Sequence, residues 1–362
     1  MCAAVVHYDG SSTVFGVGFQ TDDSTGTVAT GVTPTVALAY IQDPVSITIN
    51  ENANSRWYIN GGNARNRSGV VKGMHDGTIR FSFAVERTLD EADSDDAFWL
   101  LKMPIDGSDS VATATYTIPD GATAPEYGTF GLRVMTIETG YNPAASQIMH
   151  TKISGVVVNS MTLVVEPGKD ILWTYDCLFC RMEDTSATAA TALTESTEPP
   201  FKQGDAEIKW GNAGSAAAIT DVERFELTIN NNITRRYDIN NATSIRYCNA
   251  YSCGRREISG VMRLRLNTAA AQGIQIFEDF YGLDAATAPT DTVVLKDIVL
   301  TIYQAASKDI AYTLHDVVIG PALSFDLTGS DEQVYDIPFT ATHCVLVIRA
   351  TDATAPTGWA EV

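Results

Sequence analysis

Two stretches of the chain match each other without a gap. Residues 45–60 read VSITINENANSRWYIN and residues 225–240 read FELTINNNITRRYDIN, so 225 minus 45 gives a spacing of 180 residues. Tandem arrays of small repeats have much shorter periods, roughly 20 to 50 residues. A match at about half the length of a 362-residue chain therefore predicts a duplicated domain.

Further matches follow in the same order in both halves. The matching pairs are Gly77 with Gly260, Arg80 with Arg263, residues 155–166 with 316–327, and the motif Tyr-Asp-x-x-Phe at Tyr175 with that at Tyr335. The chain also exceeds the roughly 250–300 residues at which a single core stops growing. We therefore predict a first domain at 1–182 and a second at 205–362. Residues 183–204, rich in Ala, Thr and Glu and containing Pro199-Pro200, are predicted to be the linker.

Alternation of apolar and polar residues predicts strands in both domains. It occurs at residues 45–49, 78–86, 225–229 and 261–266, where every second side chain would point to the same face. The predicted fold is mainly β, as two tandem β-sandwich or barrel domains related by internal duplication.

One short helix is predicted in each domain. The first would begin at an N-cap at Ser94 and end at Pro104, and the second would run from Asn267 or Thr268 to Gly282. Residues 1–35 show no sustained period and are predicted to form an N-terminal arm.

Basic residues gather in two long polar segments, 61–77 and 241–259. They are Arg65, Arg67, Lys72, Arg246, Arg255 and Arg256. On an otherwise acidic protein such loops would suit docking onto an acidic face of another copy. They would equally suit plain solvation, and both interpretations stay open.

The chain is strongly acidic, with 44 acidic against 24 basic residues and a formal charge of −20. Such a surface repels phosphate backbones, which disfavours nucleic-acid binding but allows nucleic acid to pass as cargo. The same charge could simply keep a soluble protein apart from its neighbours. We expect no membrane span and no signal peptide, because long apolar runs and a charged-then-apolar start are absent.

Catalytic and metal-binding motifs are not found, so neither an enzyme nor a cofactor is predicted. His315-Asp316 would point to opposite faces of a strand. Two carboxylate pairs that a glycosidase could use are better explained as solvated surface. They are Glu223 with Glu226, and Asp331 with Glu332.

Six cysteines are too few for a disulfide scaffold in a chain of this length. Cys177-x-x-Cys180 and Cys248-x4-Cys253 could meet as a four-thiolate zinc site, although the second spacing is loose. Reduced structural thiols are the favoured interpretation, and no metal is predicted.

The second half resembles a known family. Residues 205–281 contain KWGNAG, ITDVERFELTINNNITRRYDIN, a long loop, GRREISGVMRLRL and a predicted helix, in that order. This series is similar to the major tail tube proteins of long-tailed, siphovirus-like phages or archaeal tailed viruses, here in a duplicated two-domain form. The first half follows the plan more loosely, because its loop has no counterpart of Arg255-Arg256-Glu257.

The resemblance implies a structural virion protein of the tail, assembled in the host cytoplasm. Subunits of this family form rings, usually six-fold, that stack into a hollow tube and conduct viral DNA during ejection. A chain with two tube domains would close as a homotrimer with pseudo-six-fold symmetry. Segments 61–77 and 241–259 would be inter-ring loops. The other expected partners are a tape-measure protein, tail terminator and baseplate proteins, and double-stranded DNA as a transient, non-adhering cargo.

Polar residues on the predicted strands are candidates for the lumen or barrel wall. They are Ser46, Thr48, Arg80, Ser82, Glu226, Thr228, Arg263 and Arg265. Acidic groups there would keep DNA from adhering, whereas unpaired arginines would bind it. Whether Arg80, Arg263 and Arg265 are paired with carboxylates therefore tests whether this face would let DNA pass.

The alternative function is a two-domain β-sandwich binding or adhesion protein of a virion or cell surface. Such a protein would need exposed aromatic residues. Trp57, Trp173 and Trp210 lie within or beside predicted strands, where burial is expected. A hydrolase, supported only by the carboxylate pairs, ranks last.

Overall fold

The structure is a computed structural model. It describes residues 13–19, 31–56, 69–87, 89, 97–105, 110–112, 115–119, 134–141, 150–184, 198–212, 214–237, 248, 250–265, 276, 279, 295–305, 308–320 and 334–349. Only the backbone is described for the strand residues 13–14, 42–44, 50–56, 69–75, 110–112, 115–119, 140–141, 150 and 183–184.

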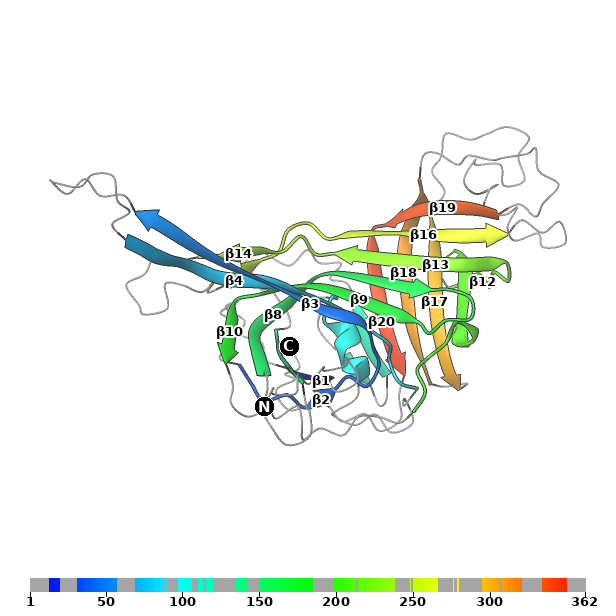
Figure 1. The fold of residues 1–362 in the computed structure, drawn as a ribbon. Coiled ribbons are helices and arrows are strands. Elements are labelled where there is room, and N and C mark those ends of the chain that lie inside the picture. Colours follow the sequence, from blue (N-terminus) through cyan, green and yellow to red (C-terminus); the bar gives the residue numbers. More distant parts are fainter. Residues whose placement is uncertain are drawn as a thin grey trace.

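One long antiparallel sheet runs through the whole molecule (Figure 1). Its strands, in spatial order, are β3 (Ile41–Arg56), β4 (Gly69–Phe83), β9 (Leu172–Phe179), β8 (His150–Val165), β13 (Val222–Asn230), β16 (Glu257–Arg265), β19 (Val334–Ala341) and the end of β18 (Lys308–Ile319). The ladder between β8 and β13 joins the first half of the chain to the second. We call this sheet the long sheet.

A second layer packs against one face of the long sheet. In the first half it contains β1 (Thr13–Phe19), β2 (Val36–Ala37), β7 (Met135–Tyr141), the start of β8 and β10 (Arg181–Asp184). In the second half it contains β11 (Ala206–Gly211), β12 (Ala217–Ala218), β17 (Lys296–Ala305), β18 and β20 (His343–Arg349). A first-half hairpin, β5 (Ser110–Ala112) with β6 (Thr115–Pro119), adds to the free edge of β20.

The two halves pair their strands in the same order. In the first half, β1 pairs with β2 and β7, β8 with β7, β10 and β9, and β4 with β9 and β3. In the second half the same pattern is formed by β11, β12, β17, β18, β20, β19, β16 and β13. A bulge lies at the same place in each, with a positive φ of 66° at Gly155 and 51° at Asp316.

Two glycines occupy equivalent positions in this plan. A Cβ on Gly77 would lie 2.3 Å from the ring of Phe179, and one on Gly260 would lie 2.3 Å from the ring of Phe339. The register of the adjoining strand differs by two residues, however, because Ile49 faces Gly77 while Leu227 faces Gly260. An even shift leaves every side chain on its own face, so the polar and apolar patterns survive it.

A single hydrophobic core extends between the layers through both halves. It holds stacked aromatic rings, such as Phe83 on Trp173, and the 3₁₀ helix η2 (Ala97–Lys102), all of whose residues are buried. The Trp173 indole donates a hydrogen bond to Tyr312 Oη at 3.1 Å, which links the two halves.

Several sequence predictions are corrected by the structure. Residues 13–19 of the predicted N-terminal arm form β1, with Phe15, Val17 and Phe19 in the core. The first predicted helix is a shorter 3₁₀ helix, and it is buried on all sides rather than on one face. Of the second, only Ile276 and Asp279 are described, and both are helical and buried.

The predicted loops and linker also contain regular structure. Strand β4 begins at Gly69, within the predicted loop 61–77, while β15 (Ala250–Ser252) and the start of β16 lie within the predicted loop 241–259. In the predicted linker, residues 183–184 belong to β10, and Pro200 forms a bridge with Glu86. The end of the linker is therefore packed against the first half.

Candidate lumen face and sheet edges

The side of the long sheet that faces away from the second layer carries polar side chains. We call it the polar face. All eight residues predicted for the lumen lie on it, as their cross-strand partners indicate: Ser46 is opposite Arg80, Ser82 opposite Thr174, Thr228 opposite Thr162, and Arg263 opposite Asp336. The alternation of each strand places most of the apolar residues on the other side, against the core, while Val164, Val261 and Val334 lie on the polar face.

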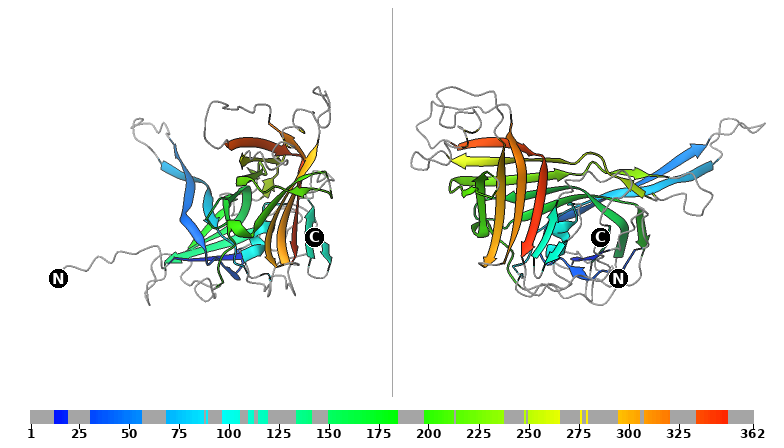
Figure 2. Two further views of the ribbon diagram at one scale, coloured as in Figure 1. Left: turned by 90° about the vertical axis from the view of Figure 1, so that its right-hand side faces the viewer. Right: turned by 180° about the vertical axis from the view of Figure 1, so that it is seen from behind.

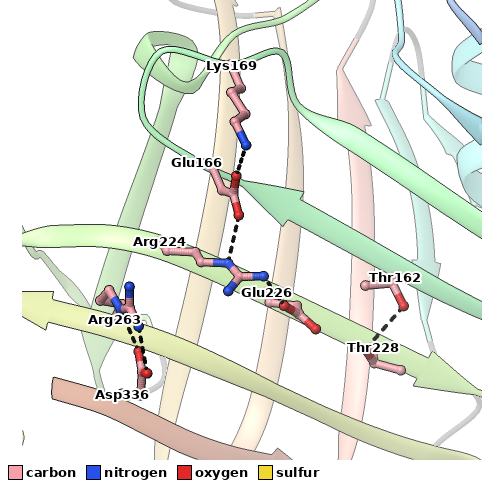
Figure 3. Close-up of polar contacts among 8 residues, drawn as sticks. All are labelled: Thr162, Glu166, Lys169, Arg224, Glu226, Thr228, Arg263 and Asp336. Carbon is pink, nitrogen blue, oxygen red and sulfur yellow. Dashed lines mark hydrogen bonds and ion pairs between the residues drawn. The ribbon is translucent and has the colours of Figure 1, made fainter. Parts of the chain in front are cut away.

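Every arginine predicted for this face has a carboxylate partner. Arg263 makes two hydrogen bonds to Asp336, at 2.7 and 2.9 Å (Figure 3). Arg80 Nε lies 3.6 Å from Asp176, and Arg265 contacts Glu223. Arg80 with Asp176 and Arg263 with Asp336 occupy equivalent positions in the two halves. The unpaired arginines that would hold DNA are thus not found among these three residues.

Arg224 extends the network between the halves. Its Nε lies 3.0 Å from Glu166 and its Nη2 2.7 Å from Glu226, while Lys169 bonds Glu166 at 2.6 Å (Figure 3). The Lys169 hydrogen bond lowers the pKa of Glu166, and the Arg263 hydrogen bond lowers that of Asp336. These carboxylates therefore stay ionised well below neutral pH.

The charges of this network balance. Five cations, Arg80, Lys169, Arg224, Arg263 and Arg265, face five carboxylates, Glu166, Asp176, Glu223, Glu226 and Asp336. The pairs are largely solvent-exposed, so they add little to stability. Their main effect is that no cation in the network is left without a counter-charge.

Hydroxyl groups fill the space between the ion pairs. Ser82 and Thr174 share a hydrogen bond of 2.8 Å, and Thr162 and Thr228 one of 3.4 Å across the junction of the halves (Figure 3). These four hydroxyls are thus engaged with one another, whereas Ser46 and Thr48 on the same face are exposed.

Both edges of the long sheet are open among the described strands. Strand β3 pairs with β4 alone, and Ser46 and Thr48 are exposed. At the other edge the end of β18 pairs with β19 alone in this sheet. Unpaired edges of this kind are templates for another strand.

A two-stranded arm extends from the first half. It consists of residues 50–56 of β3 and 69–76 of β4, which pair only with each other among the described strands. It projects well beyond the body of the molecule (Figures 1 and 2).

The corresponding hairpin of the second half folds back on the first half. Beyond β13 the chain forms β14 (Thr234–Arg236), which pairs with β15. Arg235 contacts Asp76 and the carbonyl of Gly77, and Tyr237 donates to Asp76. Burial, together with the Asp76 carboxylate, raises the pKa of Tyr237 to about 12.

An apolar contact lies beside this ion pair. Tyr251 donates to the carbonyl of Gly155 and packs with Ile233 and Cys248 over Val157 and Cys180. Sequence reasoning named Cys180 and Cys248 only as possible zinc ligands and missed the apolar contact itself. The available signal was the set of aromatic and cysteine residues in RRYDIN and YCNAYSC, within an otherwise polar stretch.

The predicted basic loop residues are only partly within the described chain. Arg65, Arg67 and Arg246 lie outside it, and for Lys72 only the backbone, in β4, is described. Arg255 is exposed, whereas Arg256 donates to Asn231 at 2.8 Å and so serves an internal contact.

The thiols are distributed differently from either prediction. Cys180 and Cys248 form a disulfide, while Cys177 and Cys344 are free and buried and Cys253 is free and partly buried. The described residues contain no cluster of three or more metal-ligating side chains. Among the same residues, no helix has the length and hydropathy of a membrane span.

The structure places some of the residues considered for the alternative functions. Trp173 and Trp210 are buried, and Trp57 lies outside the described residues. Glu223 and Glu226 are held in the ion pairs above, and His315 bonds Asp297 at 3.0 Å rather than Asp316. Asp331 and Glu332 lie outside the described residues.

Comparison with known proteins identifies the family. No curated protein matches the chain significantly. The family model for the phage tail tube protein matches residues 10–341, which include both halves, the polar face and both edges of the long sheet. With that coverage, the chain belongs to the phage tail tube protein family and is a structural component of the virion tail.

Proposed function

We propose that this chain is the major tail tube subunit, which closes into homotrimeric rings that stack into a hollow tube and conduct double-stranded DNA during ejection. The observation that carries the proposal is the polar face: a continuous surface with a charge-balanced network of ion pairs, on a sheet with two open edges. A surface of this kind is suited to line a channel and to continue from one subunit to the next.

The polar face would let DNA slide because it offers few sites for retention. Affinity for DNA comes mainly from cations that replace the counterions of phosphates. Here the guanidinium groups of Arg80, Arg263 and Arg265 are already paired with carboxylates. The ion-paired part of the lining is therefore neutral, and the exposed carboxylate of Glu257, opposite Asn230, adds negative charge to it.

Ring closure would repeat a joint that the chain already contains. Six residues of β8, 160–165, pair with 225–230 of β13 to join the halves. If the halves arose by duplication, as their shared pairing order supports, the end of β18 takes the place of β8 and β3 that of β13. The open edge at the end of β18 would then join β3 of the next copy, and three chains would close a ring of six units.

Stacking of rings would use those parts of the segments 61–77 and 241–259 that belong neither to the arm nor to the contact of β15 with the first half. The expected partners are the tape-measure protein and the terminator and baseplate proteins of the tail, with assembly in the host cytoplasm. Membership of the tail tube family supports self-assembly, and the finer partner set is part of the proposal.

Electron microscopy of the purified protein, followed by class averaging of end views, tests this function. We expect hollow tubes or rings with three-fold symmetry and six lobes. A protein that stays monomeric at high concentration, even with tail-assembly partners added, would contradict the proposal.

The charge balance of the channel has a separate test. Replacing Asp336 by Asn frees Arg263 of its partner. Tubes of this variant should retain DNA at low salt, whereas Asp336→Asn combined with Arg263→Gln should behave like the parent. Equal DNA retention by all three would show that pairing of these arginines is irrelevant.

A further inference from the structure

An apolar patch on the first half is covered by the second half of the same chain. The covered patch consists of Val134, Val157, Leu178 and Cys180. The fold-back hairpin of β14 and β15 lies on it through Ile233, Cys248 and Tyr251, and Val157 is left 0% exposed.

The second half has an equivalent patch. Val156 pairs with Met135 as Val317 pairs with Lys296, so Val157 and Val134 correspond to Val318 and Leu295. Phe179 faces Gly77 as Phe339 faces Gly260, so Leu178 and Cys180 correspond to Pro338 and Thr340. We call Leu295, Val318, Pro338 and Thr340 the open patch.

The open patch is exposed. Leu295 is 48% exposed and Val318 39%, and these are two of only five large hydrophobic residues so exposed in the described chain. Thr340 is exposed as well. Apolar side chains gathered on a surface in this way mark an interaction site.

The segment equivalent to the fold-back hairpin is the arm of β3 and β4. Ser55, which matches Arg235 in the repeat, is paired with Val70, just as Arg235 is paired with Tyr251. Val70 therefore has the register position in the arm that Tyr251, which covers Val157, has in the fold-back hairpin.

The arm does not reach the open patch of its own chain. It projects from one end of the molecule, while β17 and β18 lie at the other end (Figures 1 and 2). Leu295 directly precedes β17, and Val318 belongs to β18. One unused arm and one uncovered patch per chain are complementary between copies.

We propose that the arm of one copy docks on the open patch of a second copy, in the way that β14 and β15 cover the first half within one chain. The inference rests on the proposed ring assembly and names the surfaces of its joint. The joint would combine two contacts: the strand edge of β3 and the arm on Leu295 and Val318.

The two contacts differ in their polar part. Within the chain, Arg235 and Asp76 form an ion pair beside the apolar contact. Between copies, the matching positions are Ser55 and Ser259. The joint between chains would therefore depend mainly on apolar burial and respond little to salt.

Surface variants test the open patch. Leu295→Asp and Val318→Asp should leave the monomer folded, because both residues are exposed, but should raise the protein concentration needed for ring formation by roughly tenfold or more. Val334→Asp is the matched control: Val334 is 40% exposed and lies on the same face of the long sheet, but opposite Arg265 and at the other end of β19 from Thr340. Circular dichroism checks the fold, and sedimentation velocity measures the fraction in rings.

Cross-linking between two variants tests the occupant. Within one chain, Tyr251 Oη lies 3.1 Å from Cys180 Sγ. Val70 corresponds to Tyr251 and Thr340 corresponds to Cys180, so Val70→Cys on one copy should come close to Thr340→Cys on another. A short bismaleimide should link them only when the two variants are mixed and assembled, and mass spectrometry should identify a peptide joined between positions 70 and 340.

The outcomes separate this inference from the proposed function. If the protein forms three-fold rings but the 70–340 link is absent and the patch variants assemble like Val334→Asp, docking of the arm is wrong and the tube function stands. If the parent protein forms neither rings nor tubes, the proposed function is wrong and the docking is wrong with it.

Discussion

The two hairpins at the outer ends of the halves start from matching sequences and take different paths. In the first half, β3 and β4 are 16 and 15 residues long, and their paired outer parts form the arm. In the second half, β13 ends at Asn230 after 9 residues, and the chain turns back onto the first half. The same strand plan thus yields one segment that reaches outwards and one that closes on its own chain.

Two asparagines account for the turn. Asn232 has a positive φ of 49°, a conformation that Asn tolerates better than most residues. Asn231 is buried and donates to the carbonyls of Pro104 and Val158, both at 3.0 Å. Its counterpart in the repeat is Glu51, a charged residue that could not be buried in this way. The difference between the halves therefore depends on a few side chains at the turn, while the strand plan is shared.

The largest effect is expected at the paired glycines, where the halves should behave alike. In Gly77→Ala, the new Cβ would lie 2.1 Å from the Thr48 carbonyl oxygen, and in Gly260→Ala 2.2 Å from that of Glu226. Each clash is with backbone, so each variant should lose about 3 kcal/mol of unfolding free energy. Urea denaturation measures the loss. A difference of more than about 2 kcal/mol between the variants would break the equivalence of the two positions.

The next effect should distinguish the halves. Asn231→Leu removes two buried hydrogen bonds and leaves the carbonyls of Pro104 and Val158 without this donor, so it should cost about 2–3 kcal/mol. Glu51→Leu, on the arm, is the matched control and should change stability by less than about 0.5 kcal/mol. Hydrogen exchange should also show β14 opening in Asn231→Leu. Equal costs at the two positions would refute the account of the turn.

A pH-dependent effect contrasts two buried carboxylates. Burial raises the pKa of Glu86, in the first half, from 4.5 to about 7, although the N–H groups of Glu86 and Ala39 donate to it. Asp309, in the second half, is paired with Arg349 at 2.7 Å. Because the folded state holds the Glu86 proton more tightly, stability should fall as pH rises from about 4.5 through 7.

Glu86→Gln checks this sign. It should be about 2 kcal/mol more stable than the parent at pH 8 and no different below pH 4.5, by thermal denaturation across that range. Asp309→Asn is the control and should be destabilising at pH 8, because it leaves Arg349 unpaired. A Glu86→Gln variant that gains nothing at pH 8 would contradict a raised pKa.

The smallest effect concerns the two bulges. Gly155→Ala places a side chain at a φ of 66° and should cost about 1 kcal/mol. Asp316→Gly relieves the same conformation but loses the hydrogen bond with Thr342, so it should change stability by less than about 0.5 kcal/mol. Differential scanning calorimetry can resolve both. A large loss in Asp316→Gly would show that its side chain, rather than its backbone, shapes the bulge.

The strand plan and the polar face could be predicted from the sequence because they depend on local alternation. Ile79 and Phe81 fall on the core side, and Arg80 on the other, whichever neighbours the strand has. The pairing of Arg80 with Asp176 is different, because 96 residues separate them. Its signal was the recurrence of both residues in the second half as Arg263 and Asp336, a pattern that a search for paired matches could find.

The rest depends on tertiary context. The core strand that contains Phe15 and Val17 was not predicted, because the Gly-, Ser- and Thr-rich stretches around it show no sustained alternation. The helix at 97–102 is buried on all sides by packing that its own residues do not specify. Ile49 pairs with Gly77 and Leu227 with Gly260, so the register of the two strand pairs differs by two residues. This shift keeps the alternation of polar and apolar residues, so the gapless sequence match could not reveal it.

The β6 strand, which crosses from the first half to extend β20, has a consequence for how such a chain evolves. The first half supplies a strand to the second, and the second supplies β13 to the edge of β8. A gene cut back to either half would encode a protein with a long unpaired strand edge, which favours aggregation. If the halves arose by duplication of one unit, this exchange of strands would make the fusion difficult to reverse, because a single-domain descendant would need new residues on both edges.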